Sequence, residues 1–446
     1  MATRINERST LNKKAFDKRE ILRDFKEGES AIKRRSKFYL PRFPTEDEAT
    51  YKDRVNSSFL YNILAIAINR IANKPLNKQV QIITDNEELK ATMWNFDNDG
   101  RTLLDFTRDF LSDSLWYNQG YVFVEGDNVS IIDVDNILQT QVENSELIFI
   151  RFKDIIQRRN GWDDELLEVV RVFEKIDDKV YYSIYVQEEE GSSDFIEEVF
   201  QERYFIDEIP MCRYYPFGTK YEFFPELTFL PMADIQKVLF RLDSDIINMM
   251  GVAAVPFLFF KGVDINDDEN PLVISSFNAV AANTEYADVK YVEATCSSLN
   301  FLRQERDSLI EKAQTLTIDL MSRHGGNQSA TSATIDEANN NSMMSCVAVG
   351  LKEFLEKIIS MKYKFKKGIK EPEFSVNLTT NFNINTNAEE LNFIVNAVNS
   401  QLISKKQAFL EGQRRGIISN DSTFEQNQQD ITVELEGSSS SKSFYE

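Results

Sequence analysis

The chain has 446 residues, enough for two or three domains or for one elongated subunit with a sizeable core. Its apolar content of 42% and aromatic content of 12% exclude an intrinsically disordered protein. The net charge of −21 argues against a protein that wraps nucleic acid, because such binding needs Lys and Arg to release counterions from phosphates.

The charge is unevenly distributed along the chain. Residues 1–42 carry 13 Lys and Arg against 6 Asp and Glu, a net +7, which leaves −28 for the remainder of a chain whose total is −21. Residues 11–35 within this segment predict one charged amphipathic helix. Its basic face is either solvated or contacts an acidic neighbouring subunit or nucleic acid.

The following segment, "YLPRFPTEDEATYKDR", predicts a turn and then a helix. Pro41 and Pro44 stop helices, and Thr45 with Glu48 matches a capping box. An apolar stripe with a spacing of four residues then predicts one helix that Pro75 ends. This stripe consists of Val55, Phe59, Ile63, Ala67 and Ile71.

Residues 103–117 predict another helix, and "GYVFVEG" predicts a strand. Farther on, "EVVRVFEKIDDKVYYSIYV" contains two β-branched and aromatic runs around an Asp-Asp-Lys turn, which is typical of an antiparallel hairpin. Residues 188–194 form an acidic turn. The N-terminal half is therefore expected to be α+β.

Helices return in the second half. A long helix over 232–250 is followed by a mixed segment in which "VAAVPFLFFKGV" and "DVKYVEA" predict strands, and then by a second helix over 301–323. A third helix is expected to begin at Thr334, with Glu337 as its capping-box partner. We expect its buried face to be formed by Val347, Leu351, Leu355 and Ile358.

The C-terminal region predicts a strand, a turn and two more helices. Ser404 and Gln407 match a capping box for the last helix, and Gly416 is expected to end it. The tail "GSSSSKS" is of low complexity and is expected to be flexible.

The segment "NFDNDGRTLLDF" resembles a calcium-binding loop. Asn95, Asp97 and Asp99 fall where ligands belong and Gly100 stands at the sixth position, but the twelfth position, which needs a bidentate Glu, is Phe106. We interpret the segment as a polar turn between two helices.

No catalytic constellation is present in the sequence. His324 is the only histidine, which excludes histidine clusters, and no phosphate-binding glycine motif occurs. Cys212, Cys296 and Cys346 form no CxxC pair, which indicates a reducing compartment without structural zinc. We therefore expect no enzyme activity, no cofactor and no metal.

The apolar run at 252–260 is much shorter than a membrane span, and no signal peptide precedes it. We therefore expect a protein that is made in the cytosol and does not enter a membrane.

The loop "GGNQSATSA", residues 325–333, lies between two predicted long helices and carries no charge. A surface linker is one interpretation. The other is a loop that moves or binds, because compact domains usually join helices with two to eight residues.

Taken in order, these segments resemble a tailed-bacteriophage portal protein, the head-to-tail connector. The resemblance rests on the "YLPRFPTEDEATYKDRV"-type segment, "PFLFFKGV", "SATSATIDEA" and the closing "LTTNFNINTNAEEL…QLISKKQAFLEGQRRGII", and it covers about residues 38–435. It implies an elongated α+β subunit that assembles into a ring, usually of twelve copies, at one capsid vertex. The loop is shorter and the C-terminal region smaller than the family pattern.

The resemblance also implies a division of the chain. The expected parts are a wing (1–229), a first stem helix (230–251), a β-containing clip (252–300), a second stem helix (301–323), a tunnel loop (324–333), a long helix and strand that return to the wing (334–384), and a mainly helical crown with a flexible tail (385–446).

Two sets of site residues follow from this division. In the tunnel loop facing the DNA channel the resemblance places Arg323, His324, Gly325, Gly326, Asn327, Gln328, Ser329, Ala330, Thr331 and Ser332. At the clip interface it places Val255, Pro256, Phe257, Phe259, Lys261, Asp267 and Asp268.

The expected partners are further copies of the chain, double-stranded DNA passing non-specifically through the channel, the terminase large subunit, the head-tail adaptor and the major capsid protein. The expected location is the portal vertex of the virion, and the host cytoplasm during assembly. A structural adaptor that is monomeric or a small oligomer and has no DNA role, and a hydrolase that uses carboxylates, are the alternatives.

Overall fold

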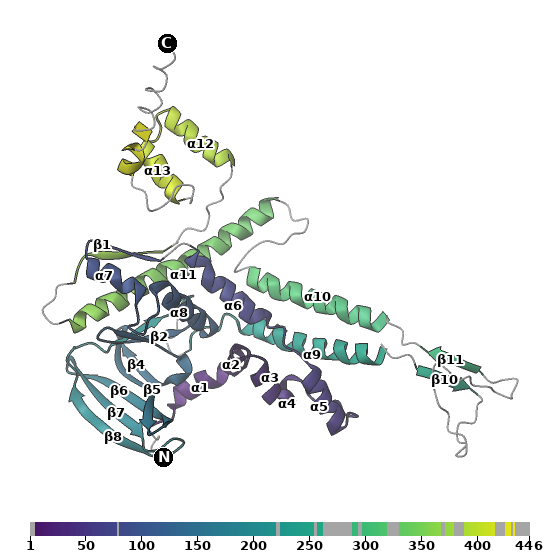
Figure 1. Cartoon of the computed structure of the whole chain (residues 1–446). Helices are drawn as coiled ribbons and strands as arrows, with labels where there is room; N and C mark the ends of the chain where they lie inside the picture. Colours follow the sequence, from purple (N-terminus) through teal and green to yellow (C-terminus); the bar gives the residue numbers. More distant parts are fainter. Residues whose placement is uncertain are drawn as a thin grey trace, which may run out of the picture. The chain divides into compact units, whose positions relative to one another are not determined.

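The structure is a computed structural model that describes residues 5–77, 80–219, 224–253, 257–261, 288–292, 297–318, 330–366, 371–378, 388–414, 424–429 and 431–432. The chain divides into two compact units, residues 1–380 and 381–446, and each is described by itself. Helices and strands are mixed in the first unit, as expected for an α+β protein (Figure 1).

The N-terminal segment is not one helix, as its amphipathic pattern predicted. It forms α1 (Thr10–Lys18), α2 (Glu20–Glu27), α3 (Glu29–Arg34) and α4 (Ser36–Tyr39). Gly28 between α2 and α3 has φ +95°, a backbone conformation that glycine adopts without a steric penalty. The broken path lets Leu22, Phe25 and Ile32 all enter the core.

The next predicted helix is also divided, into α5 (Glu48–Ser57) and α6 (Ile63–Asn73). Asp47, rather than Thr45, is the N-cap of α5, because its carboxylate accepts the Thr50 N–H at 2.9 Å. The hydroxyl of Ser58 bonds back to the Val55 carbonyl at 2.7 Å, and Asn62 caps α6. These local side-chain bonds outcompete a continuous helix, and Phe59 is left exposed between the two helices.

The strands predicted in the N-terminal half are confirmed, within two antiparallel sheets. One has the order β3-β2-β9, formed by Asn128–Ile132, Gly120–Glu125 and Met211–Tyr214. The other has the order β4-β5-β6-β7-β8, formed by Ile137–Glu143, Glu146–Asn160, Asp163–Ile176, Lys179–Gln187 and Phe195–Arg203. Asp177 and Asp178 form the β6–β7 turn with φ of 48° and 59°, as hairpin turns require.

Two long helices form a core against the three-stranded sheet. The predicted helix at 103–117 is α8 (Leu103–Tyr117), and α11 (Ala330–Phe365) contributes the predicted buried face. Phe110 of α8 stacks on Phe354 of α11 with ring centroids 4.5 Å apart. The hydroxyl of Tyr214 in β9 donates to the Val347 carbonyl at 2.9 Å. Helix α11 therefore joins α8 to the three-stranded sheet.

Short elements complete the first unit. They are η1 (Lys74–Leu76), α7 (Glu87–Ala91), η2 (Thr92–Trp94), η3 (Val134–Asn136) and the antiparallel pair of β1 (Gln81–Thr84) with β12 (Phe374–Asn377). Pro75 lies inside η1, so α6 ends just before the proline. The β1–β12 pair fixes the segment that follows α11 to the N-terminal part of the chain.

The remaining elements of the first unit are α9 (Leu230–Ala253), β10 (Phe257–Lys261), β11 (Asp288–Val292) and α10 (Ser297–Ile318). Strands β10 and β11 pair antiparallel, and in the chain they lie between α9 and α10 (Figure 1).

The second unit contains α12 (Ala388–Asn399) and α13 (Lys405–Arg414). The predicted capping box of α13 is confirmed, since Ser404 Oγ accepts the Gln407 N–H and Gln407 Oε1 accepts the Ser404 N–H, each at 3.1 Å. Gly416 and the serine-rich tail lie outside the described residues.

Packing around Gly120 yields a stability prediction. A Cβ at this position would lie 2.8 Å from both Phe110 and Ser114, so Gly120→Ala should lower the free energy of unfolding by about 1–3 kcal/mol. The matched control is Gly350→Ala in α11, where the nearest atom would be 3.5 Å away and the higher helix propensity of Ala should stabilise by up to ~1 kcal/mol. Urea denaturation of both variants measures the difference, and equal midpoints would contradict this packing.

Candidate functional site: a two-helix projection and its root

Helices α9 and α10 form an antiparallel pair that extends away from the rest of the first unit towards β10 and β11 (Figure 1). Arg306 of α10 donates to Asp243 of α9 at 2.6 Å, and farther along the pair Arg303 approaches the Met250 sulfur at 3.7 Å. The Asp243 side chain is only 9% exposed, so this ion pair fixes the relative position of the helices more strongly than a surface pair would.

The start of α9, the root of the projection, is held by one buried amide. Gln236 Oε1 accepts the Ile63 N–H at 3.0 Å, and Gln236 Nε2 donates to the Tyr61 carbonyl at 2.8 Å. Both groups stand at the start of α6, where backbone N–H groups lack partners within the helix. With 2% exposure, Gln236 is shielded from competing water, so it is a rigid joint between α6 and α9.

A second contact fixes α9 to the N-terminal helices. Arg241 donates to the backbone carbonyls of Tyr39 and Phe38 at 2.7 and 2.8 Å, which satisfies the C-terminal end of α4. The Lys237 ammonium lies 3.6 Å from the centre of the Phe38 ring. The root of the projection is therefore held from two sides.

Apolar side chains remain exposed along the projection. Phe301 of α10 is 65% exposed, and Leu316, Val238 and Met250 are each more than 40% exposed. Elsewhere on α10, Ala313 is buried, whereas Leu302 and Leu309 are only half-buried. Helix α9 thus covers part of the apolar surface of α10 and leaves the rest available to a partner.

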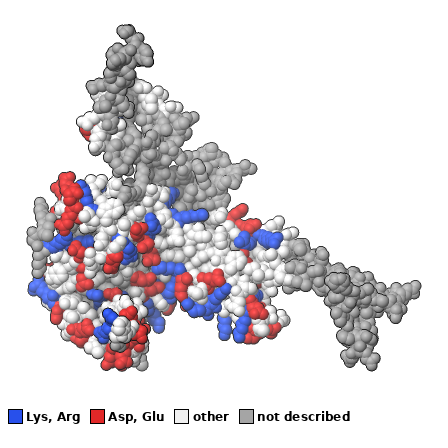
Figure 2. Space-filling view, viewed as in Figure 1, with Lys and Arg blue, Asp and Glu red and all other residues white. Residues whose placement is uncertain are grey.

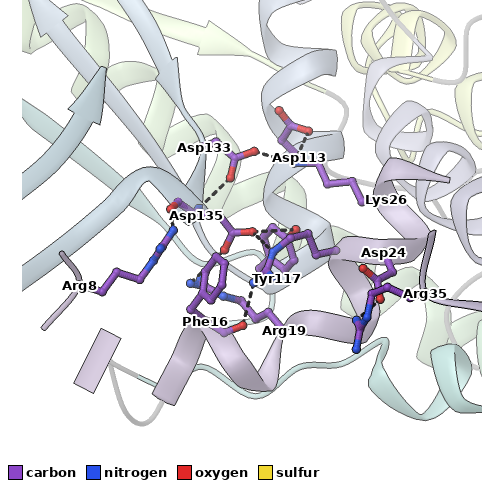
Figure 3. A network of polar contacts seen from close by, with 11 residues as sticks. Arg8, Phe16, Arg19, Asp24, Lys26, Arg35, Asp113, Tyr117, Asp133 and Asp135 are labelled. Carbon is purple, nitrogen blue, oxygen red and sulfur yellow. Dashed lines mark hydrogen bonds and ion pairs between the residues drawn. The ribbon is translucent and has the colours of Figure 1, made fainter. Parts of the chain in front are cut away.

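Part of the basic N-terminal segment packs against acidic groups of its own chain, a pairing that the sequence interpretations did not include, whereas Lys13, Lys14 and Lys18 are exposed. Figure 3 shows Arg8 and Arg19 beside Asp135. Arg23 Nε donates to the Asp135 carboxylate at 2.7 Å, Arg19 lies 3.3 Å from it, and Arg8 donates to the Asp135 backbone carbonyl. The Phe16 ring stacks against the guanidinium groups of Arg8 and Arg23.

Lys26 extends this network. Its ammonium lies 3.1 Å from both Asp113 of α8 and Asp133. Burial by itself would raise the pKa of the Asp133 carboxyl, but Lys26 and the backbone N–H of Asp135 hold that pKa below its ordinary value. Arg19, Arg23 and Lys26 are thus neutralised by acids more than 85 residues away in sequence, a pairing that no local pattern reveals.

Most of the predicted tunnel loop lies outside the described residues, from Arg323 to Ser329. The prediction for its last residues is wrong: Ala330, Thr331 and Ser332 are the first residues of α11, so the helix begins before Thr334. Alanine has the highest helix propensity, and the small polar residues that follow are tolerated in a long helix.

The predicted clip residues are only partly described. Val255, Pro256, Asp267 and Asp268 lie outside the described residues. In β10, Phe257 pairs with Val292, Phe259 with Lys290 and Lys261 with Asp288.

The calcium-like segment forms a turn that is satisfied without a cation. Asp97 Oδ1 accepts the N–H groups of Asp99 and Arg101 at 3.0 Å each, and the Arg101 guanidinium donates to Asp97 Oδ2 at 2.5 Å. The arginine thus occupies the position of a positive ion, which agrees with a polar turn. Within the described ranges, no group of three or more His, Cys, Asp or Glu could hold a metal ion.

Two buried groups have shifted pKa values. Burial lowers the pKa of Lys362 to about 8, and its ammonium donates to the Phe96 carbonyl at 2.8 Å. Burial raises the pKa of the Cys212 thiol to about 12, so it stays protonated and unreactive.

One protein family, described as a domain of unknown function (DUF4055), matches residues 229–366. This match spans α9 to α11, which is less than half of the chain. No curated protein matches.

Solved structures similar to the chain include three from gene transfer agent particles. A chain in the neck of an empty GTA particle computed with C6 symmetry has a TM-score of 0.45 and 8% identity, covering 83% of this chain and 94% of that one. A chain in the virion of a native gene transfer agent (GTA) particle has a TM-score of 0.43 and 10% identity, and one in the neck of a native GTA particle computed with C12 symmetry has 0.42 and 11%. Both cover 77% of this chain and 88% of the other. At these TM-scores the likeness does not establish a common fold.

No helix among the described residues combines the length and the apolar character needed to cross a membrane.

The polar network around Lys26 predicts that acid weakens the attachment of the N-terminal helices. Because the folded-state pKa of Asp133 is lowered, its contribution to stability is present above its unfolded pKa of about 3.9 and is lost as the pH falls through the folded value. Asp133→Asn should therefore lose stability at neutral pH and show a smaller further loss below about pH 4. Unfolding midpoints measured across this range test the prediction. Asp163→Asn, at an exposed position, is the control, and parallel acid curves for wild type and Asp133→Asn would contradict it.

Proposed function

We propose that the chain is the subunit of a portal-type ring that serves as the conduit for genome packaging and ejection at one capsid vertex. In this proposal α9 and α10 are the stem helices, β10 and β11 belong to the clip, and residues 381–446 include the crown. Terminase and the head-tail adaptor would dock at the clip, and the capsid protein at the wing. The ring would work through its shape, its charge and its contacts with partners, without catalysis.

The observation that carries this proposal is the α9–α10 projection. A projection fixed at its root by Gln236 and Arg241, yet bearing exposed Phe301 and Val238, is suited to side-by-side packing with further copies. Interfaces that form permanently bury apolar surface of this kind. The order of elements, with a small β insertion between two long helices, is the order expected from the sequence resemblance.

The charge also fits a conduit. A chain with net charge −21 repels phosphates at long range, so a ring of such chains would let DNA slide without capturing it. On the face seen in Figure 2, acidic and basic side chains are interspersed.

A structural adaptor without a DNA role is the second candidate, since it could use the same projection to bind one partner. Molar mass in solution separates the two proposals. A mass near 51.6 kDa favours the adaptor, and a mass about twelvefold larger favours the ring.

The exposed apolar residues of the projection predict the effect of charge on assembly. Phe301→Asp should shift the ring towards monomers, because a carboxylate buried at a subunit contact loses hydration without gaining a partner. Gln304→Asp, at another exposed position of α10, is the control for added charge. Light scattering gives the mass of each. The same shift is expected for Phe257→Asp and Phe259→Asp, and an unchanged mass in all three Phe variants would contradict an apolar assembly surface.

Shortening the segment before α11 is expected to impair DNA packaging without impairing ring assembly. Removing Gly325–Ser329 leaves the described start of α11 intact, so the ring should still assemble. Packaging or retention of DNA should fail, because the uncharged glycine-containing loop is proposed to shift with the duplex as it slides past. Replacement by an equally long Gly-Ser segment is the control for length. Normal amounts of packaged DNA in the deletion variant would make the loop a simple linker.

A further inference from the structure

Helix α6 belongs to a segment of unusual composition. From Arg54 to Thr84 the sequence contains no Asp or Glu, although the whole chain has 72 of them, and this is its longest acid-free stretch. Burial explains only one side of α6, where Leu64, Ile68 and Ile71 are fully covered. The opposite side is exposed, and nothing in the fold of a single chain requires it to lack acids.

The exposed side of α6 and η1 forms a shallow hollow. It is lined by Ile66, Asn69, Arg70, Asn73, Lys74 and Asn77. The three asparagines are four residues apart, so they follow one face of the helix. Two of the six side chains are cations, three are amides, and one is apolar.

Two hydrogen bonds fix side chains of this surface in place. The Ser112 hydroxyl of α8 donates to Asn69 Oδ1 at 3.0 Å. The amide NH2 group of Asn69 therefore points away from Ser112. Asn73 Nδ2 donates to the Asn69 carbonyl at 2.7 Å. The exposed Arg70 forms no ion pair with any residue that the structure describes. Since the buried side of α6 is fixed in the core, the polar side cannot turn inwards.

We propose that this exposed face of α6 is a weak, sequence-independent contact for the phosphate backbone of duplex DNA. Arginine, lysine and asparagine side chains are the usual protein partners of phosphate oxygens. No residue that lines the hollow carries a carboxylate, and on the adjacent α8 Asp109 and Asp113 are paired with Arg101 and Lys26. The inference rests on the proposed conduit, because α6 is joined through Gln236 to the first turns of α9, at the root of the proposed stem.

A second copy of the chain is a poorer fit for this face. Stable protein interfaces have apolar cores rich in aromatic residues, whereas this hollow offers only Ile66, which is 39% exposed. Two cations in each subunit bind a duplex weakly, which suits DNA that must slide. In a ring, many copies of this weak contact face the same duplex, so together they bind DNA more tightly than one copy does.

The test measures binding of a short fluorescent duplex to the purified full-length assembly at low and moderate salt. The variant Arg70→Glu/Lys74→Glu should weaken binding about tenfold at low salt and lower the slope of log K against log salt by about 0.9 for each phosphate that the protein no longer neutralises. The control, Lys13→Glu/Lys14→Glu, makes the same charge change at two exposed positions of α1. Equally weakened binding in both variants, or unchanged binding in both, would overturn the proposal.

A photo-crosslinking amino acid at Asn73 gives an independent measurement, with the same amino acid placed at Lys13 as the control. Crosslinks from position 73 to the duplex and none from position 13 support the proposal. Crosslinks from position 73 to another copy of the chain, or a lower assembly mass for Arg70→Glu/Lys74→Glu, would make the face a subunit interface and overturn it. A wild-type chain that stays monomeric contradicts the conduit itself, whereas a ring that binds duplex equally well in wild type and variant contradicts only the role of α6.

Discussion

The buried face of α11 is the constraint on which the first unit depends. Val347, Leu351, Leu355 and Ile358 are fully buried, and each contributes roughly 1.5–3 kcal/mol through apolar burial. On this face α8 meets the helix through Phe110, and β9 meets it through Tyr214. Because α11 also leads to β12, which pairs with β1, one helix joins the sheets, the helical layer and the end of the unit.

Polar interactions then fix the relative positions of helices that apolar packing alone does not determine. Apolar surfaces can slide by a fraction of a helical turn at small cost, but a buried amide such as Gln236 loses two hydrogen bonds if α6 or α9 shifts. Arg241 and the network around Asp135 act in the same way on the N-terminal helices. The projection can therefore present exposed apolar residues to a partner without collapsing onto its own chain, which is what an assembly surface requires.

The charge distribution has two physical roles. Acidic residues dominate the chain, yet Asp113, Asp133 and Asp135 serve to hold the basic N-terminal segment in place. The acid-free face of α6 is the opposite case, since Arg70 there has no acidic partner among the described residues. Net charge alone thus describes neither region. The presence or absence of acidic groups around each cation distinguishes structural cations from those available for binding.

The sequence by itself determined the elements whose signals are local: α8, the β6–β7 hairpin, the α13 capping box and the buried stripe of α11. Periodicity, turn chemistry and capping act within a few residues, so they can be read from a single chain. Only the tertiary structure decided the breaks at Gly28 and Asn62, the partners of Arg19 and Arg23, and the joint at Gln236. These depend on groups brought together from 100 or more residues away, or on small differences between competing hydrogen bonds, and neither leaves a periodic trace in the sequence.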